Sequence, residues 1–201
     1  MNSTKNNTVR QKKLMALAGL FWFFFLIFYL LGALTFHAGE QAFTALYVWF
    51  NSSIFSPILI ALLSITIVFH VVTAVTRQLS NNVSSGDRYK KPYPKAIPRL
   101  VAWSGASIIL IFIVTHSVQM FSIDSTDLYS EIQLIFQRPM MWAIYGLGMI
   151  AISTHLHHGL INVLQTFGIS SKQPKGLAFG IVFVIMAGYA SIPLGILYAK
   201  I

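Results

Sequence analysis

The chain has 201 residues, of which 56% are hydrophobic and 9% are charged, and it contains no cysteine. A soluble domain carries about 25% charged residues, so this composition excludes an ordinary soluble globular protein and predicts an integral membrane protein. The lack of cysteine excludes disulfides, thiolate-bound iron–sulfur clusters and a cysteine nucleophile.

Five uncharged apolar runs follow one another along the chain, each close to the roughly 20 residues that cross a bilayer as a helix. We predict an all-α fold, a single-domain bundle of five transmembrane helices, with spans at about 14–36, 57–76, 100–121, 139–163 and 176–199. Ser56 and Pro57 predict the start of the second span, as a cap followed by a proline in the first turn. The aromatic segment 40–50 predicts a short helix in the membrane interface.

The basic residues predict how the bundle is oriented, because Lys and Arg are retained on the cytoplasmic side of a membrane. Twelve of the 14 lie before the first span, between the second and third spans, or between the fourth and fifth. The remaining two, Arg138 and Lys200, lie on the other side with four of the five acids. This distribution explains the net charge of +9 without nucleic acid. It places the N-terminus in the cytoplasm and the C-terminus outside.

Histidines occur at two depths within the predicted spans. Ionisable residues inside a membrane commonly mark a functional site, although a histidine can also simply bond a neighbouring helix. Since a helix rises about 1.5 Å per residue, His70 lies ~10 Å and His155 ~12 Å from the cytoplasmic ends of their spans. His116 lies ~24 Å from that side, at a second level.

Two histidines at one depth on different helices suit the two axial positions of a haem held in a bundle core. Gly148 and Gly159 share a helix face with His155, where small residues leave room for a porphyrin or allow close helix packing. Arg77 follows His70 by two helical turns on the same face. It is a candidate partner for a haem propionate, or an ordinary anchor at the cytoplasmic surface.

Four segments resemble the cytochrome b membrane anchor of succinate dehydrogenase and fumarate reductase, of the type with five helices on one chain. They are FLIFYLLGAL, FHVVTAVTRQ, IFIVTHSVQMF and HLHHGLINVLQTFG, one in each of the first four spans. The last is similar to the family's HLxHG followed by a QT-G ending. The resemblance covers nearly the whole chain.

This resemblance implies a multi-pass protein of the bacterial cytoplasmic (inner) membrane that binds haem b. It also implies a flavoprotein subunit and an iron–sulfur subunit docked on the cytoplasmic side, with electrons passing between succinate and a membrane quinone, commonly menaquinone. We expect no chemistry on succinate from the chain itself, because it has no soluble domain and no flavin-binding G-x-G-x-x-G motif.

In that family, four histidines on the first four helices bind two stacked haems. The resemblance assigns His70 and His155 to the haem nearer the cytoplasm and His116 to the outer haem. Tyr29 stands where the family has its first-helix histidine, which leaves three outcomes open. In the first, Tyr29 ligates as a tyrosinate after losing a proton whose ordinary pKa is near 10. In the second, His116 holds the haem alone or with another partner such as His37. In the third, the outer haem is absent. In the last case, its place is filled by Trp22, Phe25 and Tyr29.

Other polar residues have weaker assignments. His158, one turn from His155, is a candidate contact for a propionate or for the backbone of another helix. His157 points away from His155 and is assigned no role. The candidate polar contacts for a quinone, near the outer ends of the first helices, are Glu40, Asn51 and Gln119.

Three alternative functions remain open from the sequence. The cytochrome b subunit of a hydrogenase or formate dehydrogenase would also use paired membrane histidines. A small transporter would use histidines to relay protons, but it predicts paired repeats and broken helices, and no repeat is visible. A purely structural anchor would have lost its haems. The basic loop between the second and third spans is a candidate docking surface for a soluble subunit, or serves topology alone.

Overall fold

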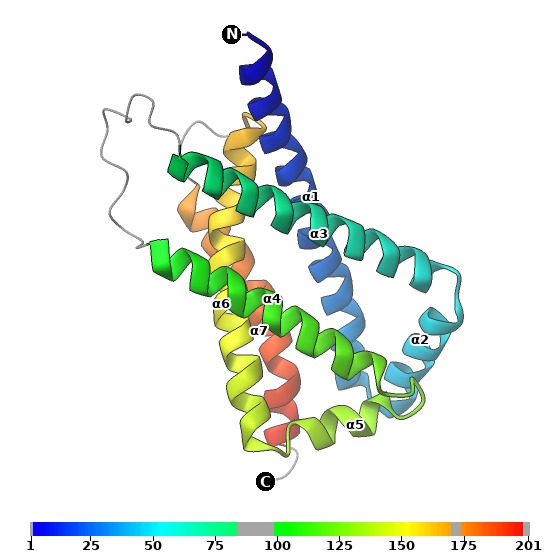
Figure 1. The fold of residues 1–201 in the computed structure, drawn as a ribbon. Helices are drawn as coiled ribbons and strands as arrows, with labels where there is room; N and C mark the ends of the chain where they lie inside the picture. Colours follow the sequence, from blue (N-terminus) through cyan, green and yellow to red (C-terminus); the bar gives the residue numbers. More distant parts are fainter. Residues whose placement is uncertain (1, 84–98, 170–173, 199–201) are drawn as a thin grey trace.

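The computed structural model describes residues 2–83, 99–169 and 174–198. This part of the chain consists of helices joined by short turns and contains no strand, which confirms the all-α prediction for the described residues (Figure 1). The elements are α1 (Asn2–Leu34), the 3₁₀ turn η1 (Thr35–Ala38), α2 (Glu40–Ser52), α3 (Phe55–Val83), α4 (Arg99–Phe121), α5 (Leu128–Ile135), α6 (Pro139–Thr166) and α7 (Lys175–Tyr198).

Four helical segments are long and apolar enough to cross a membrane: Val9–Ala38, Phe55–Arg77, Ser104–Phe121 and Lys175–Tyr198. They belong to α1 with η1, α3, α4 and α7, and they support a multi-pass membrane protein. The fourth predicted span corresponds to α6, which has 28 residues but is not among the four. Its hydropathy is lowered by the polar side chains His155, His157, His158, Asn162 and Gln165.

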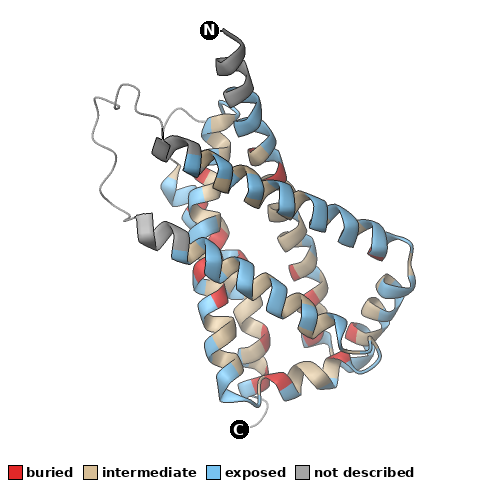
Figure 2. Ribbon diagram, viewed as in Figure 1, coloured by how far each residue is buried: buried red, intermediate tan, exposed pale blue. Residues whose placement is uncertain are grey.

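Three helices form the centre of the bundle, since α1, α6 and α7 each pack against the other two (Figure 1). On the flanks, α3 packs on α1 and α4 packs on α6. Among the described side chains of α3 only Ser56 is buried, and no described side chain of α4 is buried (Figure 2). Apolar surface of this extent is suited to lipid or to bound partners rather than to water.

A cluster of buried hydrophobic residues lies where η1, α2 and α5 meet the ends of α1 and α7. Phe43 of α2 is only 2% exposed, and the rings of Phe36 and Tyr129 stack with their centres 4.4 Å apart. The helix predicted over 40–50 is therefore present as α2. The sequence did not predict α5, which packs on α2 at the same end of the bundle.

Two glycines shape the ends of helices. Gly39, between η1 and α2, has φ of +97°, a conformation that other residues adopt only with strain. Gly168 has φ of +71° and follows α6. The Ile169 N–H donates to the Leu164 carbonyl at 2.9 Å and the Gly168 N–H to the Gln165 carbonyl at 3.1 Å, which is the Schellman pattern.

The other helix starts show smaller departures from the sequence prediction. α3 begins at Phe55, one residue before the predicted cap Ser56. The turn before α5 is closed by Asp124, whose Oδ1 accepts hydrogen bonds from the Thr126 N–H at 2.9 Å and the Thr126 hydroxyl at 2.8 Å. These bonds stabilise the carboxylate and lower the pKa of Asp124.

Candidate functional site

The structure brings His70 of α3 and His155 of α6 together. The centres of their rings lie 6.2 Å apart, and the ring planes are inclined at 74°. Within the described residues, α3 packs closely on α1 and α2 rather than on α6. The two imidazoles thus approach each other between helices whose backbones are not in close contact.

This spacing fits two ligands on opposite sides of one metal atom. Bonds from a metal to an imidazole nitrogen are about 2 Å long, so two such bonds in line place the ring centres about 6 Å apart. The angle between the ring planes is free in this arrangement, because both planes contain the line through the metal. His70 and His155 therefore have the separation that an axial histidine pair requires.

One edge of the His70 ring faces α1. Its Nδ1 atom is buried and faces the Met15 backbone of α1, without a hydrogen bond of good geometry. A Cβ added at Gly19 would lie 3.6 Å from the His70 Cε1 and 3.9 Å from Nδ1, so Gly19 marks the close approach of α1 to this edge. In metal-bound histidines one nitrogen ligates while the other is directed at a neighbouring acceptor. In His70 the Nδ1 edge is held against α1, which leaves Nε2 as the nitrogen available to a ligand.

The polar residues around this pair lie along the same two helices. Arg77 is half-buried on α3, two turns beyond His70 and ~10 Å along the axis. His158 is exposed on α6, one turn beyond His155. His157 is directed elsewhere, since its Nε2 lies 3.4 Å from the Lys175 carbonyl oxygen at the start of α7.

At the second level, His116 of α4 is hydrogen-bonded through both ring nitrogens. The Tyr145 hydroxyl donates to Gln119 Oε1 at 2.8 Å. The Tyr145 oxygen therefore accepts from the Nδ1–H of His116, at 3.1 Å. Nε2 of His116 is then the acceptor for the Tyr29 hydroxyl, at 3.3 Å. These four side chains, which we call the outer cluster, connect α1, α4 and α6.

Aromatic rings surround the outer cluster on two sides. Phe112 stacks on His116, with ring centres 5.8 Å apart and planes 12° apart. The Phe112 ring lies against Gly148 of α6, where an added Cβ would overlap it. Along α1, Tyr29 stacks on Phe25 at 5.7 Å. The row continues to Trp22, whose ring centre is 5.7 Å from that of Phe25.

The structure does not bring His37 to His116. The Ser191 hydroxyl donates to the Gly188 carbonyl at 2.7 Å, so its oxygen accepts from His37 Nε2 at 2.8 Å. His37 thus joins η1 to α7. Among residues that the sequence analysis passed over, Tyr145 and Phe112 are the most important. The rise per residue alone would have placed Tyr145 near the depth of His116.

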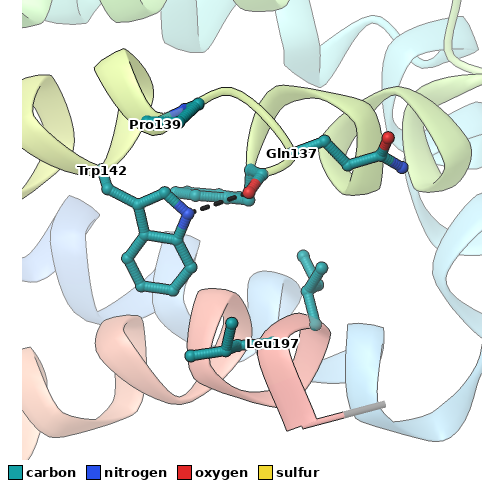
Figure 3. Close-up of a pocket in the computed structure, with 6 residues that line it drawn as sticks. Gln137, Pro139, Trp142 and Leu197 are labelled. Carbon is teal, nitrogen blue, oxygen red and sulfur yellow. Dashed lines mark hydrogen bonds between the residues drawn. The ribbon is translucent and has the colours of Figure 1, made fainter. Parts of the chain in front are cut away.

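Two surface pockets lie at the end of the bundle formed by α2 and α5. One, of about 620 Å³, is lined by Glu40, Gln41, Thr44, Ala45 and Val48. The other, of about 460 Å³, is shown in Figure 3 and is lined by Phe136, Gln137, Pro139, Trp142, Ile196 and Leu197. In the second pocket, the Trp142 indole N–H donates to the Phe136 carbonyl at 2.8 Å. Neither pocket is lined by a histidine.

Of the candidate quinone contacts, Glu40 lines the first pocket, Gln119 belongs to the outer cluster and Asn51 is exposed on α2.

No family model, curated protein or solved structure matches the chain.

Proposed function

We propose that this chain is the haem b-bearing membrane anchor of a succinate dehydrogenase or fumarate reductase, and that it carries electrons between an iron–sulfur subunit and a membrane quinone such as menaquinone. The observation that supports this most directly is the approach of His70 and His155 to 6.2 Å between ring centres, from two helices that bear the family-like motifs. The chain is not an enzyme on its own in this proposal.

The residues present fit such a group at the inner level. His70 and His155 would hold a haem b through one ring nitrogen each, while the Nδ1 edge of His70 is kept against α1. When bound, haem supplies reversible one-electron transfer whose potential is set by the axial ligands and their surroundings. The two helices would orient the imidazoles, of which His70 is half-buried and His155 is exposed in the structure. Arg77 and His158, on the cytoplasmic side of the pair in the proposed orientation, would offset the charge of the propionates.

The proposal includes five spans, with the N-terminus in the cytoplasm and the C-terminus outside. In support, α6 packs against both α1 and α7, each of which is apolar enough to cross the membrane. A helix of 28 residues between two such neighbours is also long enough to cross. Its polar side chains are then accommodated by the bundle and its cofactor.

Cysteine labelling tests this topology without background, because the natural chain has no cysteine. In intact cells, a membrane-impermeant maleimide is expected to label Ser130→Cys on α5, and to label Gln11→Cys and Gln165→Cys only after the membrane is opened. All three positions are exposed in the structure. Labelling of Gln165→Cys and Ser130→Cys from the same side would contradict a crossing by α6.

The electron-transfer function is tested by purifying the tagged chain with its partners from native membranes in mild detergent. We expect a low-spin haem b spectrum that is reduced by succinate, with co-purified flavoprotein and iron–sulfur subunits and quinone reductase activity. Reduction by hydrogen or formate instead would identify another membrane oxidoreductase. A colourless preparation would contradict the haem proposal and favour a histidine-bearing transporter.

The soluble partners are proposed to dock at the cytoplasmic end of α3 and α4. The basic loop that joins these helices supplies six positive charges between Arg77 and Arg99. Most of this loop, residues 84–98, lies outside the described residues, so the docking surface is proposed from the sequence alone.

A further inference from the structure

At the second level, His116 does not present a free nitrogen to a haem. A ligating imidazole needs one nitrogen with a free lone pair. Nε2 of His116 is the acceptor of the Tyr29 hydroxyl at 3.3 Å, and Nδ1 is engaged by Tyr145 at 3.1 Å. Because Tyr145 in turn donates to Gln119, the two tyrosine hydroxyls and the ring N–H of His116 each already have an acceptor. For a neutral imidazole, this pattern corresponds to His116 protonated on Nδ1.

The space beside His116 is also filled by the chain. One face of the imidazole carries the stacked ring of Phe112. This ring fits only because residue 148 is glycine, where any side chain would overlap it. From the sequence, Gly148 was a candidate to make room for a porphyrin; in the structure the room that it leaves is taken by Phe112.

The inner level differs from the outer cluster in its hydrogen bonds. Among the described residues, no hydrogen bond from a tyrosine engages His155 or the Nε2 edge of His70, and the Nδ1 edge of His70 faces the Met15 backbone of α1. The lone pair that a bound group would need at this level is therefore not taken by a hydrogen-bond donor of the described part of the chain. At the outer level the polar atoms satisfy one another.

We infer that the outer cluster takes the place of a second haem, so that this chain binds one haem, held by His70 and His155, and His116 is a structural residue. The inference rests on the proposed function for the inner site. In place of a cofactor, the outer cluster ties α1, α4 and α6 together with three consecutive hydrogen bonds. Inside a membrane, such bonds between helices contribute to their association.

Haem stoichiometry tests this inference. On the purified complex, the pyridine haemochrome is expected to give one haem per anchor chain. His116→Ala is expected to keep that haem and its low-spin spectrum while lowering the thermal unfolding temperature. Tyr29→Phe and Tyr145→Phe remove single hydroxyls and preserve the rings, so they are expected to retain one haem even if His116→Ala does not fold.

Two haems in the parent chain, or loss of one haem in His116→Ala or Tyr29→Phe, would overturn the inference and leave the electron-transfer proposal standing. A parent chain without haem would overturn both. The two failures are therefore distinguished by the same measurement.

Discussion

Replacing His155 with alanine is expected to remove haem b from the chain and to reduce electron transfer from succinate to quinone to background. The ring centres of His155 and His70 lie 6.2 Å apart, and loss of either imidazole would remove one of the two side chains proposed to hold the haem. The haem content per chain should fall from one to near zero, and His70→Ala should have the same effect. The pyridine haemochrome and the reduced-minus-oxidised spectrum of the purified complex measure both.

The matched control is His157→Ala on the same helix. Residues two apart on a helix point in nearly opposite directions, and His157 contacts the Lys175 carbonyl rather than His70. We expect this variant to keep its haem and its activity. Full haem content with an unchanged low-spin spectrum in His155→Ala would show that the inner pair does not hold the cofactor.

The substitution with the largest expected effect on stability is Gly148→Leu. Gly148 is buried, and even a Cβ at this position would overlap the Phe112 ring. Phe112 is stacked between α6 and His116, so it cannot move without disturbing the outer cluster. Forcing extra atoms into a well-packed core costs about 1–3 kcal/mol. At roughly 2–4 °C per kcal/mol for a chain of this size, the thermal unfolding temperature in detergent should fall by several degrees.

Gly146 provides the control for this prediction, because an added Cβ there meets no heavy atom within 4 Å. Gly146→Leu is therefore expected to change the unfolding free energy by less than about 0.5 kcal/mol. Combining Gly148→Leu with Phe112→Ala should recover part of the loss, because the smaller side chain clears the space. Equal destabilisation by the two glycine substitutions would contradict a specific role for the contact with Phe112.

The sequence predicted most of the helical elements because their signals are local. Apolar runs and charge placement located all five long helices within a few residues of their observed positions, apart from extensions such as that of α1 to Asn2. The eight-residue helix α5 was not predicted, because it carries no long apolar run and its Leu128 and Ile135 are buried by contacts with distant segments. By contrast, α6 was predicted although its apolar stretch is weaker than those of the other long helices. The histidines that lower its hydropathy are also the residues that make it a candidate for the functional site.

The amino-acid sequence by itself determined that this is a helical membrane protein, and it predicted one depth for His70 and His155. The rise of a helix is fixed, so residue numbers convert directly into depth. Only the tertiary structure decided what each level contains. Depth does not determine which helix faces are turned toward each other, so Tyr29, His116 and Tyr145 could share a level without touching. The packing of α4 on α6, with Phe112 against Gly148, joins them into one hydrogen-bonded chain. The imidazoles of His70 and His155 instead meet at 6.2 Å from helices that are not closely packed on each other.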